Sequence, residues 1–511
     1  MADTPAIRRS LERVELPPNF SWGVGASGYQ IEGGINTPVG PRNNWARWEE
    51  CGRIEPTGDA NRFWVEPSPM LDLSAAAGCD AFRYGIEWSR VQPEPSGHDD
   101  GALDDYAQLI AEGHARGIAP IMTCCHFTHP EWMGSEPWLA DPDLMVARFT
   151  SYCALLATGL NGRLVKRGLP TIRRWVTLNE LNVLPIGAYL AGETPPARTG
   201  ALRRTLAMRD VLVEAHVCGY DAIHDAYRDA GWPAPEVSTN NAAFAGYELY
   251  LMLVDVLTAR DRGVPLDQLD GDIEKRRTGH ERDRHATPTA MPSLAGRALA
   301  SVERALGRRH GGVGSLPRTL AAIRRSPRPT KLDFVAADYY SPFLEDALRR
   351  PGRRVAGGER RWRADIRLDE FTPNPAGVLW YLEQLGRYDR PVLFLESGMC
   401  SWGRRPRVDG WRRPEFLRAT LLAMVCAMDR GVDIVGYHHW SIVDNYEWGT
   451  YMPRFGLHAA ERDGGRVTFS ARDALGDDAS ATFRRLQEAL AAPGGSPERL
   501  RAFAEGGGHG R

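Results

Sequence analysis

Two glutamates close runs of apolar, strand-like sequence. Glu180 ends RRWVTLNE and Glu396 ends PVLFLE, so each carboxylate stands where a buried strand would give way to a loop. Two carboxylates from different strands that face one cavity suit hydrolysis of a glycosidic bond, in which one donates a proton and the other acts as nucleophile or base. The simpler alternative is that each glutamate pairs with an arginine at the rim of a barrel.

Further polar and aromatic residues follow other apolar runs. They are Arg83, Glu87, Trp88, His126, Asp338, Tyr339, Tyr340, Trp440, Asp444, Glu447 and Trp448. Sugars offer apolar faces for stacking and hydroxyls for hydrogen bonds, so aromatic and carboxylate side chains that converge on one mouth indicate a carbohydrate pocket. Core packing is the alternative for Trp440 or Trp448 taken alone.

The elements that would carry these residues alternate between strands and helices. The strand candidates are residues 20–27, 81–88, 119–127, 173–180, 236–244, 334–341, 391–397 and 434–441. Most are near-continuous apolar runs, as in parallel strands covered on both faces. Between them apolar residues recur at helical spacing, as in Met145, Phe149, Tyr152 and Leu156. The pattern predicts an α/β fold, a (β/α)8 TIM barrel whose active site lies at the carboxyl ends of its strands.

We expect one barrel domain over residues 1–511, because no linker or internal repeat interrupts the pattern. Two regions depart from it. Residues 261–330 are rich in Arg, Pro and Gly, which predicts long loops with one or two helices between the fifth and sixth strands. A last helix is expected around residues 480–492, and the Gly-rich stretch over about 494–511 predicts a disordered tail.

Composition narrows the class of partners. The 63 basic and 65 acidic residues leave a net charge of −2, which gives no electrostatic footprint for a nucleic acid. The amino-terminal stretch lacks the apolar core of a secretory signal, and no apolar run approaches the roughly 20 residues of a membrane span. Eight cysteines without a CxxC pair predict reduced thiols. We therefore expect a cytoplasmic protein that binds neither nucleic acid nor membrane, with a homo-oligomer left open.

Five segments carry a resemblance. They are FSWGVGASGYQIEGG (20–34), FRYGIEWSRVQP (82–93), VTLNE (176–180), FLESG (394–398) and WSIVDNYEWGTYMPRFGL (440–457). In this order they resemble glycoside hydrolase family 1, the family of retaining β-glucosidases and β-galactosidases. The resemblance implies a (β/α)8 barrel that hydrolyses the terminal non-reducing β-linked sugar, expected to be glucose, of a small glycoside. It implies no metal or organic cofactor.

Carried over residue by residue, the resemblance implies that Glu180 is the general acid/base and Glu396 the nucleophile. It also implies that Arg83 lies beside the nucleophile, that Tyr340 hydrogen-bonds it, and that Asn179 binds the sugar 2-hydroxyl. A cation and a hydroxyl donor would keep Glu396 ionised. A retaining pair must lie about 5–5.5 Å apart, and its acid must hold a proton near neutral pH.

For the sugar subsite the resemblance points to Gln30, His126, Phe127, Trp440, Glu447 and Trp448. Glu447 is informative, because the family branches that act on 6-phosphosugars lose this glutamate, whose charge would repel a phosphate. Glu180 is also intact, whereas the thioglucosidase branch has glutamine there. A non-phosphorylated O-glycoside is therefore implied.

Four motifs depart from the family pattern. Asn-Glu-Pro reads Asn-Glu-Leu at Leu181, and Thr-Glu-Asn-Gly reads Leu-Glu-Ser-Gly at Ser397, so the immediate support of each carboxylate differs. His-Trp reads His-Phe at Phe127, which removes an indole N–H. Asn-Tyr-Tyr reads Asp-Tyr-Tyr. Asp338 either adds a third carboxylate that raises a neighbour's pKa, or is neutralised by an arginine or fixes a nearby amide.

Three functions fit these residues. The first is a retaining β-glycosidase. The second is a transglycosylase that uses the same two glutamates, with an acceptor alcohol in place of water. The third is a sugar-binding family member without turnover, against which the presence of both glutamates with Arg83 and Tyr340 argues.

Overall fold

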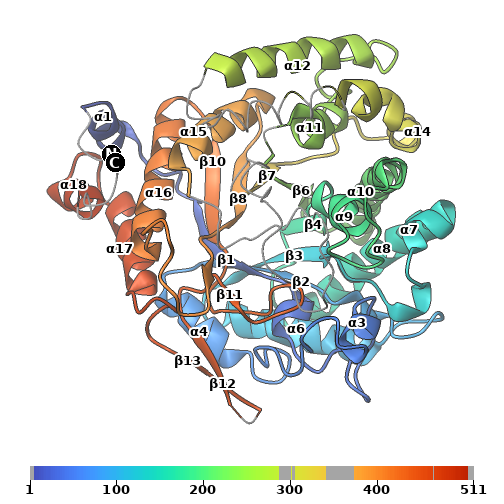
Figure 1. Cartoon of the computed structure of the whole chain (residues 1–511), viewed down its shortest axis with the longest axis horizontal. Coiled ribbons are helices and arrows are strands. Elements are labelled where there is room, and N and C mark those ends of the chain that lie inside the picture. The colour runs from blue at the N-terminus through green and yellow to red at the C-terminus, as the bar shows by residue number, and fades with distance from the viewer. Residues whose placement is uncertain are drawn as a thin grey trace.

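Parallel strands form the centre of the molecule in the computed structural model, which describes residues 5–244, 246–286, 301, 305, 307–340, 373–463 and 465–504. These strands are β1 (Ser21–Ala26), β2 (Ala81–Gly85), β3 (Ala119–Cys125), β4 (Arg174–Leu178), β5 (Glu236–Ser238), β6 (Asn240–Ala242), β7 (Val335–Tyr339), β8 (Val392–Ser397) and β10 (Ile434–His439). Figure 1 shows them enclosed by helices. Every predicted strand range contains an observed strand, and the predicted (β/α)8 barrel is confirmed.

The sheet closes through one interrupted strand position. Its order is β5-β4-β3-β2-β1-β10-β8-β7-β6, so β5 and β6 stand at its two ends. The predicted strand over 236–244 is therefore two short strands that flank Thr239. Side chains bridge this break, because the Ser238 hydroxyl donates to the Phe334 carbonyl and the Thr239 hydroxyl to the Leu178 carbonyl, both at 2.7 Å.

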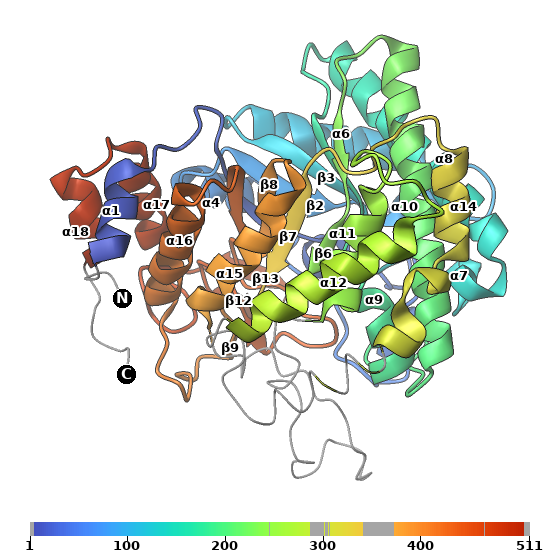
Figure 2. The same cartoon turned by 90° about the horizontal axis from the view of Figure 1, so that it is seen from above.

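Long helices surround the barrel (Figure 1), and short ones lie in the loops that follow its strands. They are α1 (Pro5–Arg13), α2 (Gly28–Ile31), α3 (Ala46–Glu50), α4 (Ser68–Ala76), α5 (Trp88–Val91), α6 (Asp100–His114), α7 (Pro137–Ala140), α8 (Pro142–Lys166), α9 (Val183–Pro185), α10 (Leu202–Ala230), α11 (Leu251–Leu257), α12 (Leu269–Ala286), α14 (Pro317–Arg325), α15 (Pro375–Leu385), α16 (Arg413–Asp429), α17 (Ala479–Ala491) and α18 (Pro497–Ala504). Neighbours pack in pairs, such as α8 with α10 and α15 with α16 (Figure 2). Among the described residues, no helix combines the length and apolarity that crossing a bilayer needs.

Short strands complete the loops at the carboxyl side. β9 (Ser401–Trp402) pairs with β11 (Pro453–Arg454), and β12 (Ala460–Asp463) pairs with β13 (Arg466–Phe469) in a hairpin. β9 begins five residues after Glu396, and β11 lies in the segment that follows β10. The antiparallel pair therefore ties together two of the loops that surround the carboxyl ends of the barrel strands.

The barrel interior changes from apolar to polar along its axis. One part of the interior is filled by an apolar cluster of strand and near-strand residues. They are Ala81, Ile121, Val176, Phe334, Ala336, Leu393 and Leu395. Side chains two positions apart on a strand share one face. The residues two positions after Ala81 and Ile121 are Arg83 and Thr123, and both are buried. The polar layer at the carboxyl ends is thus built by the strands themselves.

Ion pairs hold the Arg-rich region against the barrel. α12 lies in this region and packs near α11, above it in Figure 1. Arg276 on α12 lies 3.1 Å from the buried carboxylate of Asp255 on α11, and Arg277 lies 2.6 Å from Glu248. These arginines therefore bind neighbouring carboxylates, consistent with a sequence whose charges balance. Residues 287–300, 302–304 and 306 of the region lie outside the described residues.

The carboxyl terminus corrects one expectation. Residues 497–504, expected to be disordered, form α18, which lies beside α1 and α17 in Figure 1. Arg499 explains the difference, because its buried guanidinium donates to the carbonyls of Leu11 at 3.1 Å and Val14 at 2.6 Å, and to that of Ala489 at 3.1 Å. Composition could not reveal the two bonds to Leu11 and Val14, which join opposite ends of the chain. Residues 505–511 lie outside the described part of the chain.

A buried ion pair supports the loop after β8, and its loss should destabilise the fold. Arg413 and Asp473 are both fully buried and paired, and Arg413 also donates to the carbonyls of Met399 and Arg454 at 3.0 Å. Removing one partner of a buried pair leaves an uncompensated charge. Arg413→Met should therefore lower the free energy of unfolding by about 3–5 kcal/mol in chemical denaturation.

The adjacent residue offers a matched control for this prediction. Arg412 pairs with Asp477 but is 41% exposed, so water screens its pair. Arg412→Met should cost about 1 kcal/mol or less. Equal losses in the two variants would show that the burial of Arg413 contributes nothing.

Candidate active site

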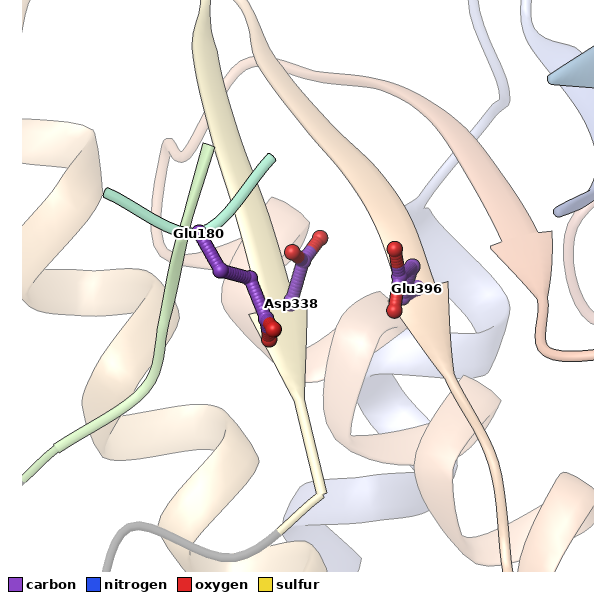
Figure 3. Close-up of side chains that lie close together, drawn as sticks. All are labelled: Glu180, Asp338 and Glu396. Atoms are coloured by element: carbon purple, nitrogen blue, oxygen red, sulfur yellow. The ribbon is translucent and has the colours of Figure 1, made fainter. Parts of the chain in front are cut away.

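The two glutamates converge with a third carboxylate at the carboxyl ends of the strands. Glu396 lies on β8, Asp338 lies on β7, and Glu180 follows β4. One carboxylate oxygen of each lies within 4.8 Å of those of the other two (Figure 3). All three side chains are buried. The two glutamates that the sequence predicts to share a cavity therefore lie together, and Asp338 lies beside them, as one of its two sequence-based alternatives predicted.

Arg83 on β2 binds the cluster through its guanidinium. Its fully buried guanidinium forms an ion pair with Glu396 and donates to the Asn179 side-chain oxygen at 2.5 Å. Its Nε donates to the Thr123 hydroxyl at 2.8 Å. Arginine presents its donors in a rigid, planar fork, so one side chain can fix several acceptors at once. Arg83 thereby fixes Glu396 relative to Asn179.

Tyr340 completes the hydrogen bonds to Glu396. Its hydroxyl donates to the second carboxylate oxygen of Glu396 at 2.9 Å, while Arg83 binds the first. Burial raises the pKa of Tyr340, and the nearby Glu396 carboxylate raises it further, so the phenol keeps its proton and remains a donor. Each oxygen of the Glu396 carboxylate therefore accepts from a different donor, one a guanidinium and the other a phenol.

Glu180 occupies a bend between strand and helix. Its φ of 44° is left-handed, a conformation that residues other than glycine rarely adopt and that clusters at functional sites. Phe127, with φ of 67°, and Trp448, with φ of 48°, share this feature. The neighbouring Leu181 is buried in place of the expected proline, and its N–H donates to the Asn240 carbonyl at 3.3 Å. Backbone geometry thus turns the Glu180 side chain into the cluster.

The surroundings of Glu180 favour its protonated form. Burial raises its pKa well above the usual value, and the Glu396 carboxylate raises it further, whereas Arg83 acts in the opposite direction. Its hydrogen-bond donor is the Asn179 amide, at 3.4 Å. One glutamate bound by a cation beside another that keeps its proton is the division of roles that acid-assisted displacement requires.

Asp338 is connected to the site through an amide. The Asn240 side-chain N–H donates to Asp338 and also, at 2.7 Å, to the Asn179 oxygen. The sequence left open whether Asp338 is a third carboxylate near the glutamates or binds a nearby amide. Both descriptions apply, because Asp338 accepts from the Asn240 amide and lies beside the glutamate pair. Burial raises the pKa of Asp338 well above its usual value, with further increases from Glu396 and Glu180.

The other expected site residues gather beside this cluster. Gln30 donates to Glu447 at 3.1 Å, and the Trp440 indole N–H donates to the second oxygen of Glu447 at 3.0 Å. The His126 ring stacks near Trp440 at 5.8 Å and Trp448 at 5.7 Å between centroids. Phe127 lies 5.0 Å from Trp448. Every residue singled out for the sugar subsite thus belongs to one connected group.

Sequence reasoning missed two residues of the site. Thr123 accepts a hydrogen bond from Arg83, and Asn240 links Asn179 to Asp338. A signal for Asn240 was present, because two consecutive amide side chains, Asn240 and Asn241, lie in the middle of the fifth predicted strand. Thr123 lies within an apolar run, where only the alternation of faces could have marked it.

A (β/α)8 barrel with buried glutamates at the carboxyl ends of β4 and β8 is the framework of an enzyme that cleaves glycosidic bonds. Comparison with known families agrees with this class. The model of glycosyl hydrolase family 1 matches residues 12–242 and 365–474, which make up most of the chain. The chain belongs to glycosyl hydrolase family 1 and is a glycosidase of the β-glucosidase type.

Its relatives are distant but cover most of the chain. Beta-glucosidase A of Thermotoga maritima is 24% identical over 469 residues, which cover 87% of this chain and 92% of that protein. The human cytosolic beta-glucosidase is 23% identical and covers 87% of this chain and 93% of its own. A structure of the Thermotoga maritima beta-glucosidase in complex with castanospermine has a TM-score of 0.66 at 20% identity and covers 94% of this chain and 99% of its own. The last comparison shows the fold.

Proposed function

We propose that this protein is a retaining β-glycosidase that removes the terminal non-reducing sugar of a small β-glycoside. The observation that carries the proposal is the state of Glu396, which is bound by Arg83 and Tyr340 and lies within 4.8 Å of Glu180. An inverting enzyme needs about 6.5–9.5 Å between its carboxyl groups to hold a water molecule. The shorter separation supports direct attack by Glu396.

Two steps follow from this geometry. In the first, Glu396 attacks the anomeric carbon, the glycosidic bond breaks, and Glu180 gives its proton to the departing oxygen. Glu396 loses its charge when the ester forms, so the repulsion that kept Glu180 protonated weakens. In the second step Glu180 takes a proton from water, and the water oxygen replaces Glu396 on the sugar.

The subsite supports a neutral hexose, with a β-glucoside as the first substrate to test. Glu447, which Gln30 and Trp440 hold in place, offers a carboxylate acceptor for hydroxyls, and Trp440 and Trp448 offer faces for stacking. The family resemblance assigns the 2-hydroxyl to Asn179. The subsite residues named above include no lysine or arginine, the side chains that would bind a phosphate. This supports a sugar without a phosphate group.

A trapping experiment tests the proposal. We expect a 2-deoxy-2-fluoro β-glucoside with an activated leaving group to add one fluoroglucosyl unit to the protein, seen by intact mass and located by peptide mapping on Glu396. Fluorine at C2 destabilises both oxocarbenium-like transition states, while the good leaving group lets the ester form faster than it breaks.

Two controls make a negative result informative. The galacto and fuco reagents test whether only the sugar was wrong, and circular dichroism shows whether the protein is folded. A folded protein that accepts none of the three labels would contradict the retaining mechanism and favour a sugar-binding protein without turnover.

A further inference from the structure

The carboxylate cluster holds more negative charge than its cation can balance. Glu180, Asp338 and Glu396 converge within 4.8 Å, and Arg83 is the one guanidinium in hydrogen-bond contact with them among the described residues. If all three acids were ionised, two negative charges would remain buried without a partner. Such a state is far more costly than one in which acids keep their protons.

Two protons neutralise this excess better than a metal ion would. A cation bound by all three carboxylates would compete with Arg83 for Glu396 and fill the space between the two glutamates, where the anomeric carbon must lie. Asp338 itself gives the second observation. It is fully buried, and its Oδ1 has no hydrogen-bond partner among the described residues, although Asn240 donates to its Oδ2. A buried carboxyl oxygen without a donor favours the neutral acid.

We propose that Asp338 is a positioning residue that keeps a second proton in the cluster and thereby holds Glu180 in the acid form that cleavage requires. The inference rests on the proposed function, because it concerns the proton that Glu180 donates. Asp338 replaces the asparagine expected from the family pattern, so this device belongs to the present chain and not to the shared mechanism.

The groups around Asp338 are consistent with this role. Glu396 on β8 and Glu180 after β4 raise its pKa, whereas Arg83 on β2 and the Asn240 amide on β6 lower it. Tyr250 and Tyr381 also face Asp338, and burial raises the pKa of both phenols, so they stay neutral. Glu447 raises the pKa of Glu180. Burial and like charge thus act together on Asp338 and Glu180.

Charge stays constant through the first step if Asp338 keeps its proton. Before the step, Glu396 carries one negative charge opposite Arg83, and Glu180 and Asp338 are neutral. The C1–O bond then breaks, the bond from C1 to the Glu396 oxygen forms, and the proton moves from Glu180 to the leaving oxygen. Glu180 now carries the one negative charge and the Glu396 ester is neutral. Asp338 exchanges nothing.

The pairing of Asp338 with Glu180 keeps Glu180 protonated, and so able to act as the acid, up to a higher pH. As pH rises, the first proton lost from the pair leaves either Asp338 or Glu180, so part of the population still has Glu180 protonated. Loss of the second proton is then opposed by the carboxylate that has already formed. Without Asp338, Glu180 would titrate against Glu396 and Glu447 only and would lose its proton at lower pH.

The test is the pH profile of kcat/KM for Asp338→Asn. Asparagine keeps the size of the side chain and can still accept from Asn240. With an alkyl β-glucoside, whose poor leaving group needs the proton, we expect the basic limb to move down by about 1–2 pH units. With a 2,4-dinitrophenyl β-glucoside, which needs no proton, the variant should show no such shift.

Asp80→Asn is the matched control. Asp80 lies at the opposite end of the barrel, immediately before β2, where it accepts from the backbone N–H of Trp22 at 3.0 Å. The basic limb of this variant should coincide with that of the unmodified protein. All profiles are recorded with a chelator, and a loss of activity on chelation would overturn the proposal in favour of a bound cation.

A spectroscopic measurement separates this proposal from the proposed function. A protonated carboxyl has an infrared C=O stretch distinct from that of a carboxylate. Both Glu180 and Asp338 should contribute to this band at neutral pH, so its intensity should fall in Asp338→Asn by the contribution of Asp338. This reading does not depend on turnover. A band that persists unchanged in Asp338→Asn, or a basic limb that does not move, would overturn the role of Asp338 even if the protein cleaves glycosides.

Discussion

Glu396→Ala should lower kcat/KM for an aryl β-glucoside by about 10⁵-fold or more, which is the loss typical when an enzymatic nucleophile is removed. The reason is that Glu396 is the carboxylate on which Arg83 and Tyr340 converge, so its removal eliminates both the attacking atom and the acceptor of those donors. Steady-state rates measure the loss. Isothermal titration with an unreactive sugar analogue should show that the subsite still binds.

Added azide makes this result specific. In Glu396→Ala a small anion can enter the vacated space and attack the anomeric carbon from the face that Glu396 used. The product should then be an α-glycosyl azide, with one inversion, and its anomeric configuration can be read by proton NMR. A β-glycosyl azide from this variant would contradict the nucleophile assignment. Glu396→Asp, which keeps the charge but shortens the side chain by one methylene, should recover only part of the rate.

The sequence predicted the barrel and the two glutamates because both depend on local patterns. Parallel strands covered on both faces are continuous apolar runs, and the residue that ends such a run must lie at the rim of the barrel. Glu180 and Glu396 therefore needed no long-range information. Their partner Arg83 was found in the same way, because it lies in the second strand, but its ion pair with Glu396 joins residues 313 positions apart.

Features that depend on contacts across the fold were beyond the sequence. The break between β5 and β6 at Thr239 is closed by hydroxyl groups that bond to β4 and to the segment before β7, and polar strand residues of this kind look the same whether or not a strand is continuous. α18 was taken for a disordered tail because glycines precede and follow it, whereas the buried contacts of Arg499 order it. In both cases the deciding bonds join distant segments.

Asp338 shows most clearly what the sequence alone could not predict. Its departure from the family pattern was visible in the sequence, and so were its two alternative roles, but choosing between them required distances. The structure gives Asn240 as its amide partner and places it within 4.8 Å of both glutamates. A bulge in the pairing of β7 with β8 falls between Ala337 and Asp338, and such irregularities re-aim side chains beside active sites.

Glu180→Ala should separate substrates by their leaving group. With an alkyl β-glucoside we expect kcat/KM to fall by about 10²–10⁴-fold, since the departing alkoxide then receives no proton. With a 2,4-dinitrophenyl β-glucoside the fall should be less than about tenfold, because that leaving group departs as an anion without help. Burial and the neighbouring Glu396 raise the pKa of Glu180, so the unmodified protein has this proton to give near neutral pH.

Hydrolysis of the glycosyl ester provides an independent test on the same variant, Glu180→Ala. With the activated substrate the glycosyl ester on Glu396 still forms, but no base remains to deprotonate water, so the ester should accumulate as a burst followed by slow turnover. Azide needs no base. It should accelerate this turnover and give a β-glycosyl azide, with two inversions, which is the anomer opposite to that expected from Glu396→Ala. The proposed roles place Glu180 and Glu396 on opposite faces of the anomeric carbon, so the two variants should give opposite anomers. Identical azide products from both would contradict the assignment of both residues.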